Sequence, residues 1–235
     1  MGSIDMATNQ QDKQAAWIEY LKTVDSPTLS NAIELLQVRS RQEGFTPLAV
    51  RCLFPQFGRM IGYAVTAQVE TVTSSGPHDI ERYIELYRAV EQSPKPAVVV
   101  FQEIGGFGEY AAHAGEVMCT IFQKLGAVGL VSDCGVRDLP EVRALGFQYF
   151  ARGAVVSHAN SRIVRVGLPV TVHGLAVHPG DLLHGDENGL LSVPAGHEEA
   201  IPKAVDDVRT RERRLLNWVK SDNFSLDRFK GFVVE

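Results

Sequence analysis

The sequence predicts an α/β fold with parallel strands. Two short apolar runs, 97–101 and 127–132, have the continuous hydrophobic character of strands that are buried on both faces. Between them, apolar residues recur at helical spacing up to a stop at Gly126, at Val117, Met118, Ile121 and Leu125. A strand, a helix and a second strand in this order favour parallel pairing of the two strands.

The segments before this unit supply two helices, a strand and a third helix. We expect helices over 14–20 and 30–38, the second preceded by Ser26-Pro27-Thr28, which offers N-cap chemistry. The segment 61–69 alternates apolar residues with smaller or more polar ones, which is the period of a strand. A turn is expected at 74–77, where the chain reads Ser-Ser-Gly-Pro, and a helix over 79–91.

After residue 148 the pattern changes to short strands and turns. The stretch LLHGDENGLLSVP contains Asn188-Gly189, a strong signal for a β-hairpin. Residues 196–219 read as a closing helix. We therefore expect one domain over 13–220, a flexible N-terminus over 1–12 and a C-terminal tail over 221–235.

Composition excludes several function classes. With a net charge of −5 and a pI near 5.8, the chain lacks the basic excess that nucleic-acid binding usually needs. It has no apolar run long enough for a membrane span and no signal-peptide core at its start. Its 3 cysteines show no paired spacing for zinc or a disulfide framework. These features predict a cytoplasmic protein with no nucleic-acid or membrane partner.

The end of the second buried run carries a cluster of charges. The stretch GLVSDCGVRD places Asp133 at the strand end and the adjacent pair Arg137-Asp138 shortly after it. Strand ends and the loops after them often present catalytic or binding residues. An adjacent arginine and aspartate could together hold a small anionic or metal-bound ligand, or could form an ordinary surface ion pair. The residues alone leave both interpretations open.

The glycine-rich loop GGFGEYAAHAG also allows two interpretations. Gly106-x-Gly108-x-x-Ala111 has the spacing of a dinucleotide fingerprint, and Asp133 follows at a suitable distance for a ribose hydroxyl. This favours a nucleotide-cofactor enzyme, but it places Gly115 inside a helix at a cost of about 1 kcal/mol relative to alanine. If the helix instead begins near Gly115, the backbone N–H groups of Glu116, Val117 and Met118 form an anion site suited to a carboxylate.

The stretch GEVMCTIFQKLGAVGLVSDCGVRD resembles the signature of the RraA-like family, which includes the metal-dependent 4-hydroxy-4-methyl-2-oxoglutarate aldolases, or class II pyruvate aldolases. Further matches are GYAVTAQVE from Gly62, the ARG at 151–153 and PGDLLHGDENGLLSVP at 179–194, so the resemblance covers roughly 25–215. It implies a three-layer β/β/α sandwich of the swivelling-domain type with N- and C-terminal helices, assembled as a trimer or a dimer of trimers. Some members instead restrain ribonuclease E without catalysis, and this second function stays open.

The resemblance also assigns roles. It implies that Asp138 holds Mg²⁺ or Mn²⁺ and that Arg137 lies against the keto oxygen of a small 2-oxo acid. The helix-start amides of Gly115, Glu116, Val117 and Met118 would bind the substrate carboxylate. Glu116 would orient the water that removes the proton of the C4 hydroxyl. The implied reactions are cleavage of 4-hydroxy-2-oxo acids to pyruvate and decarboxylation of oxaloacetate through the same enolate.

Glu212 lies on the apolar stripe of the closing helix, where a carboxylate needs a partner. Its side chain could extend to solvent or pair locally with Arg209, or, as the resemblance implies, approach the active site of an adjacent subunit. Asn31 departs from the aspartate that many family members carry there. We interpret Cys134 as a packing residue, and His173, His178 and His184 as turn or surface residues.

Overall fold

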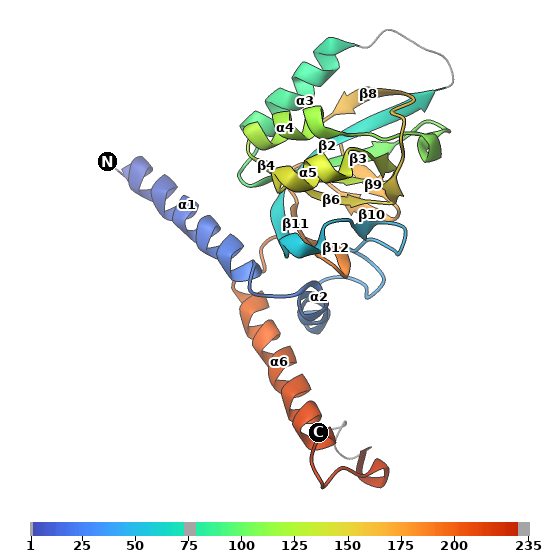
Figure 1. The fold of residues 1–235 in the computed structure, drawn as a ribbon. Helices are drawn as coiled ribbons and strands as arrows, with labels where there is room; N and C mark the ends of the chain where they lie inside the picture. Colours follow the sequence, from blue (N-terminus) through green and yellow to red (C-terminus); the bar gives the residue numbers. More distant parts are fainter. Residues whose placement is uncertain (1, 73–78, 230–235) are drawn as a thin grey trace.

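The computed structural model describes residues 2–72 and 79–229 and has one large mixed sheet at its centre (Figure 1). Four of its strands run parallel, as the strand, helix, strand pattern predicts. In spatial order they are β2 (Met60–Val72), β3 (Ala97–Glu103), β4 (Ala127–Ser132) and β6 (Gln148–Ala151). The expected turn at 74–77 lies outside the described residues.

Antiparallel strands complete the sheet on both sides of this parallel core. The two-residue strand β1 (Arg51–Cys52) pairs with β6, and β8 (Asn160–Val166) pairs with the second half of β2. Along the same edge of β2 as β8, β11 (Leu182–Asp186) pairs with the start of β2 and continues into β12 (Gly189–Val193). The hairpin predicted at Asn188-Gly189 is confirmed, since Asp186 pairs with Gly189 across a turn of two residues.

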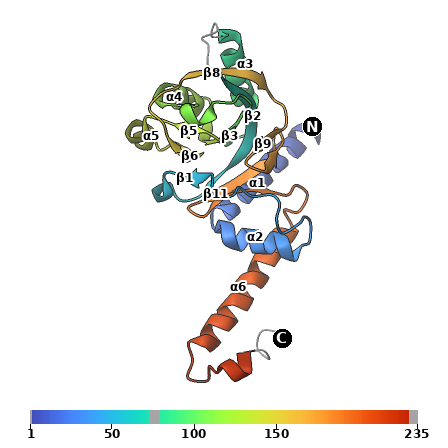
Figure 2. The same ribbon diagram turned by 90° about the vertical axis from the view of Figure 1, so that its right-hand side faces the viewer.

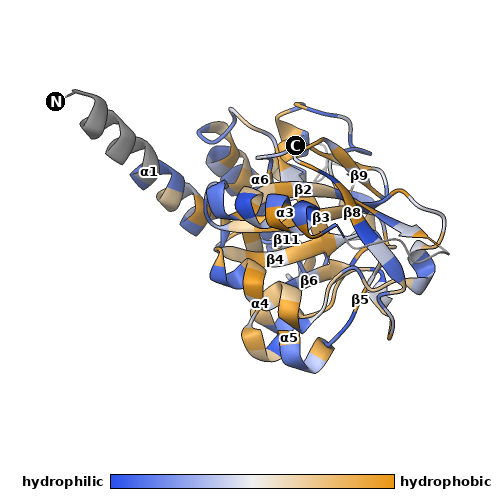
Figure 3. Ribbon diagram, turned by 90° about the horizontal axis from the view of Figure 1, so that it is seen from above, coloured by the Kyte–Doolittle hydropathy of each residue, from blue (hydrophilic) through white to orange (hydrophobic). Residues whose placement is uncertain are grey.

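Two further layers cover the sheet and make the fold a β/β/α sandwich. Helices α3 (Ile80–Gln92), α4 (Glu116–Lys124) and α5 (Leu139–Leu145) lie on one face. The small sheet of β9 (Val170–Val172) and β10 (Leu175–Val177) lies on the other. Because side chains alternate along a strand, the odd residues 99 and 101 of β3 face the helices, and the even residues 98 and 100 face β9 and β10. Figure 3 shows these apolar central strands between more polar outer elements.

Besides the packing on the two faces of the sheet, the N- and C-terminal helices form a separate hydrophobic cluster with the hairpin and the start of β2. In it, α1 (Gly2–Leu21), α2 (Ser26–Leu35) and α6 (Ala200–Val219) pack against Ile61, Leu191 and Val193. Figures 1 and 2 show α1 and α6 extending away from the sandwich. None of the helices in the described residues has both the length and the apolar character needed to cross a bilayer.

The structure corrects three local predictions. The first helix spans Gly2–Leu21 and so begins well before the expected start at residue 14. The second helix begins at Ser26, and its cap is Asp25, whose Oδ1 accepts a 2.9 Å hydrogen bond from the amide of Thr28. The closing helix starts at residue 200, four residues later than expected.

His184 is a further correction, because it is a core residue of β11 and fully buried. Its Nδ1 lies 3.1 Å from the hydroxyl of Ser26, and its Nε2 lies 2.9 Å from the carbonyl oxygen of Val24. Burial lowers the pKa of this imidazole. The side chain thus joins the hairpin to the turn between α1 and α2. By contrast, His173 and His178 are exposed, as predicted.

Candidate functional site

The candidate site begins where the glycine-rich loop enters α4. Residues 111–114 run beside β5 (Gly135–Val136), which pairs with β7 (Gly153–Ala154). The amide of Arg137 donates to the carbonyl of Ala114 at 3.0 Å. The backbone therefore holds the two predicted site segments, 115–118 and 137–138, against each other.

Gly115 is the N-cap of α4, so the helix begins where the second interpretation of the loop expects it to begin. A Cβ at this position would lie 2.3 Å from Asp138 Oδ2 and 3.0 Å from Arg137 Nε, so only glycine allows the carboxylate to come this close. The Oδ2 atom accepts a 2.9 Å hydrogen bond from the amide of Glu116. That amide is therefore already used, so the expected set of N–H groups reduces to those of Gly115, Val117 and Met118.

Asp138 adopts the left-handed conformation, with φ of 56°, at the start of α5. This turn directs its carboxylate toward the N-terminus of α4, where the helix dipole favours a negative charge. Its Oδ2 lies 3.7 Å from Nε of Arg137, and the two side chains are 37% and 39% exposed. The arginine and aspartate thus form a pair that solvent, or a ligand, can reach.

A cavity of about 290 Å³ opens at this pair. Its lining includes five of the predicted site residues, Gly115, Val117, Met118, Arg137 and Asp138. The side chain of Glu116 is exposed beside it. The lining residues that sequence reasoning missed include Tyr83 and Tyr87 of α3, His158 just before β8 and Ser161 within β8. The spacing of the two tyrosines places them on one face of the predicted helix and was the available signal.

A larger cavity of about 450 Å³ lies elsewhere, between α1 and the amino ends of the parallel strands. Its lining includes Lys22, Arg59 and Lys95, but Lys22 pairs with Glu19 at 2.7 Å and Arg59 donates to a backbone carbonyl. The smaller cavity is the better candidate site, because it combines the arginine and aspartate pair with a helix N-terminus.

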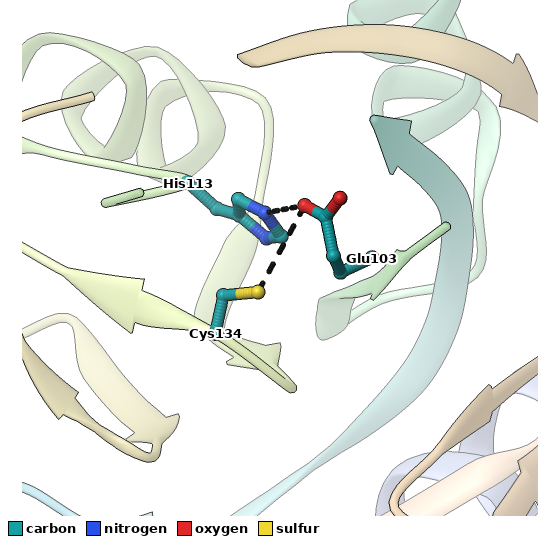
Figure 4. A group of neighbouring side chains, drawn as sticks. All are labelled: Glu103, His113 and Cys134. Carbon is teal, nitrogen blue, oxygen red and sulfur yellow. Dashed lines mark hydrogen bonds and ion pairs between the residues drawn. The ribbon is translucent and has the colours of Figure 1, made fainter. Parts of the chain in front are cut away.

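A buried hydrogen-bond network supports the loop behind this cavity (Figure 4). Nε2 of His113 lies 2.8 Å from Oε2 of Glu103, and its Nδ1 lies 3.0 Å from the hydroxyl of Ser132. Glu103 also accepts hydrogen bonds from the amides of Thr71 and Gly105 and from the hydroxyl of Thr71. Burial alone would raise the pKa of Glu103, but the hydrogen bonds from His113 and Thr71 outweigh it and lower the pKa.

Cys134 completes this network, with its Sγ 3.9 Å from Oε2 of Glu103. The ligand-type atoms of Glu103, His113 and Cys134 lie within 4.8 Å of one another. However, histidine and carboxylate are in direct hydrogen-bond contact, and the carboxylate already has several donors. Burial and the neighbouring Asp133 raise the pKa of the thiol. We interpret the cluster as a structural network that fixes the loop before Gly115, consistent with Cys134 as a packing residue.

The dinucleotide interpretation is wrong in geometry. Gly108 begins a 3-10 turn, η2 (Gly108–Tyr110), and extended backbone follows before α4 begins, so Gly106 and Gly108 do not open a helix. The side chain of Asp133 also has another role, because both of its carboxylate oxygens accept hydrogen bonds from the amide of Glu103, at 2.8 and 3.0 Å. It is not placed to bind a ribose hydroxyl.

Glu212 lies outside this cavity, on the exposed part of α6. Its described partner is not Arg209, which donates to the carbonyl of Thr23, but Asn31, whose Nδ2 lies 3.4 Å from Oε1 of Glu212. The residue that departs from the family pattern is therefore the one that contacts this glutamate. Within one chain, Glu212 does not join the other predicted site residues.

Comparisons with known proteins identify the family of this chain. The RraA-like family, described as Aldolase/RraA, matches residues 26–191. A protein of Halalkalibacterium halodurans named "Putative 4-hydroxy-4-methyl-2-oxoglutarate aldolase" is 29% identical over 163 residues, 67% of this chain and 72% of that protein.

Two solved structures share the fold. An uncharacterized protein from Pseudomonas syringae superposes with a TM-score of 0.70 at 23% identity, over 92% of this chain and 93% of that one. Streptomyces coelicolor RraAS2, described as an unusual member of the RNase ES inhibitor RraA family, gives a TM-score of 0.67 at 22% identity, over 85% and 95%. The family match spans most of the sandwich and both segments of the candidate site. The chain belongs to the RraA-like family.

Proposed function

We propose that this protein is a divalent-metal-dependent carbon–carbon lyase that cleaves 4-hydroxy-2-oxo acids to pyruvate and decarboxylates oxaloacetate through the same enolate. The observation that carries this proposal is the meeting of Arg137 and Asp138 with the N-terminus of α4 in one cavity. The relative from Halalkalibacterium halodurans supports the reaction class by its name.

The donor set fits a magnesium or manganese ion. Oδ2 of Asp138 accepts from the amide of Glu116, while Oδ1 has no hydrogen-bond partner among the described residues. Mg²⁺ is commonly held by one or two carboxylates, with waters and substrate oxygens completing its coordination. A single half-exposed aspartate beside an open cavity suits such an ion. When bound, the ion supplies Lewis-acid polarisation of the substrate keto group.

The remaining steps are assigned to this chain's own groups. The amides of Val117 and Met118 hold the substrate carboxylate at the positive end of α4. Arg137 stabilises the enolate oxygen as negative charge develops on it. Glu116 orients the water that removes the C4 hydroxyl proton, the C3–C4 bond breaks, and its electrons form the pyruvate enolate, which is then protonated at C3.

The primary test is a coupled assay of pyruvate release over several 4-hydroxy-2-oxo acids and oxaloacetate. We expect turnover that requires added Mg²⁺ or Mn²⁺ and stops with a chelator. Absence of pyruvate release from every compound in the presence of metal would favour a non-catalytic, regulatory role instead.

Glu116→Gln is expected to separate the two reactions. Decarboxylation has no hydroxyl proton to remove, so the variant should slow aldol cleavage by at least about tenfold more than it slows oxaloacetate decarboxylation. Arg137→Lys is the comparison, because it loses the planar guanidinium and should depress the turnover number of both reactions. Steady-state kinetics on both substrates measures these ratios, and equal losses in Glu116→Gln would exclude its role in removing the proton.

Glu212 is proposed to complete the active site of an adjacent subunit in a trimer or a dimer of trimers. Glu212→Gln should then weaken metal-dependent turnover without dissociating the particle. Mixing it with Asp138→Asn, after subunit exchange, should restore part of the activity, since some sites would combine two intact halves. Light scattering checks the assembly. A fully active monomer, or no rescue after demonstrated exchange, would rule out a shared site.

A further inference from the structure

The proposed reaction ends with a proton delivered to C3 of the pyruvate enolate. In aldol cleavage the water at Glu116 takes the proton of the C4 hydroxyl, whereas oxaloacetate decarboxylation releases no such proton. Both reactions pass through the same enolate, so both need a proton donor at C3. A histidine of the candidate cavity has the placement and the hydrogen bonds that this step requires.

His158 follows a segment that the backbone holds against both parts of the candidate site. The amide of Val155 donates to the carbonyl of Val136 at 2.9 Å, and the carbonyl of Ser157 accepts from the amide of Ala112 at 2.8 Å. The segment therefore contacts β5, which leads to the arginine and aspartate pair, and the extended backbone that leads into α4. The next residue is His158, which lines the cavity.

A hydrogen-bonded turn presents this histidine. Ala159 has a φ of 46°, which is uncommon for a residue other than glycine. Its amide donates to the hydroxyl of Ser157 at 3.0 Å, and the amide of Ser161 donates to the carbonyl of His158 at 3.3 Å. The backbone on both sides of His158 is therefore fixed next to the cavity.

The ring of His158 has one nitrogen that can transfer a proton. Its Nδ1 lies 2.6 Å from the carbonyl oxygen of Ala159. A carbonyl oxygen can only accept, so Nδ1 carries a hydrogen, and Nε2 is the nitrogen that gains and loses a proton. His113, which also lines the cavity, differs because its two ring nitrogens contact Glu103 and Ser132.

The tyrosine hydroxyls of the same cavity are weaker acids than an imidazolium. Burial raises the pKa of Tyr83, and burial together with the neighbouring Tyr83 raises the pKa of Tyr87. Both phenols therefore hold their protons more tightly than a free phenol does. A histidine can release a proton and regain it near neutral pH, which suits a step that occurs once in every turnover.

We infer that His158 is the general acid that protonates C3 of the pyruvate enolate. This inference rests on the proposed function and assigns its last step. The Nε2–H bond of the imidazolium breaks, the electrons of the enolate double bond form the new C3–H bond, and the enolate oxygen becomes the keto oxygen of pyruvate. The neutral imidazole then regains a proton from water. In the reverse direction neutral Nε2 removes a methyl proton from pyruvate, so the protein should exchange these protons with solvent.

Exchange of the pyruvate methyl protons tests this step alone. In D2O with Mg²⁺, proton NMR should show loss of the methyl signal with the parent protein, and a chelator should stop the loss. We expect His158→Gln to slow the exchange by at least about 100-fold, the lower end of what a positioned acid or base contributes. His178→Gln is the matched control and should exchange at the parent rate, because His178 is exposed outside this cavity, 3.5 Å from Asp181.

Two comparisons distinguish a proton donor from a residue that only supports the site. Oxalate is a planar dianion that resembles the pyruvate enolate, and calorimetry should show that magnesium-loaded His158→Gln binds it as tightly as the parent does. In Glu116→Gln, aldol cleavage should fall more than exchange does, because Glu116 serves the hydroxyl proton. Equal losses of exchange in His158→Gln and Glu116→Gln would assign both protons to one group and contradict the inference.

Three further results would overturn the assignment of His158. They are undiminished exchange in His158→Gln, a loss of oxalate affinity as large as the loss of exchange, and the absence of metal-dependent exchange in the parent protein. Pyruvate release from oxaloacetate by the parent protein reports separately on the proposed function, so the lyase activity can stand while the role of His158 fails.

Discussion

Replacing Asp138 with asparagine is expected to reduce metal-dependent pyruvate release by at least about 100-fold, since the loss of a group that only supports a metal ligand already costs about 10- to 100-fold. The change removes a charge and almost no volume. Asparagine Oδ1 can still accept the hydrogen bond that the amide of Glu116 now gives to Asp138. The start of α4 should therefore stay capped while the affinity for a divalent cation falls.

Two measurements separate these effects. Titration of Mn²⁺ by electron paramagnetic resonance reports metal affinity, and thermal unfolding without metal reports stability. Asp207→Asn, at an exposed position on α6, is the control for losing one negative charge. Unchanged Mn²⁺ affinity and unchanged turnover in Asp138→Asn would show that Asp138 does not bind the metal.

Gly115→Ala is expected to have a comparable effect through geometry alone. The added methyl would meet Oδ2 of Asp138 at 2.3 Å and Cγ of Arg137 at 3.1 Å, both closer than ordinary contact. Either α4 or the arginine and aspartate pair must shift, and a displacement of about 1 Å in an active site can cost about 100-fold in rate. We expect oxaloacetate decarboxylation to fall by that order, with little change in the far-ultraviolet circular dichroism.

Gly106→Ala is the matched control from the same loop. A Cβ there would meet no atom within 4 Å, and Gly106 is not among the glycines with positive φ. Its activity should equal that of the parent protein. A large loss of activity in Gly106→Ala together with normal activity in Gly115→Ala would show that the site does not lie at Gly115.

Much of the fold is predictable from the sequence because its signals are local. The apolar runs at β3 and β4, the stop at Gly126 and the Asn188-Gly189 turn each act within a few residues and are confirmed. Helix starts are less predictable, since Asp25 competes with Ser26 for the same cap and only backbone geometry decides between them. The burial of His184 depends on carbonyl groups more than 150 residues away, which no local pattern reveals.

The candidate site was likewise predictable in part from the sequence. Gly115, Arg137 and Asp138 belong to a motif and could be located from it, as the cavity supports. Two facts needed the structure. The amide of Glu116 is occupied by Asp138, and the tyrosines of α3 line the same cavity as a helix start more than 20 residues later. Such contacts depend on how helices settle on the sheet, which periodicity alone does not specify.

The central strand β2 has a consequence for how the chain is made. Its first residues pair with β11, so during synthesis Met60 has no strand partner on this edge until Gly185 has been made. Until β11 emerges from the ribosome, the backbone of 60–63 presents an open sheet edge on an apolar strand, the kind of edge that recruits other chains. Nascent or truncated chains that stop before Leu182 should therefore depend on chaperones or aggregate, whereas the finished protein closes this edge with its own hairpin.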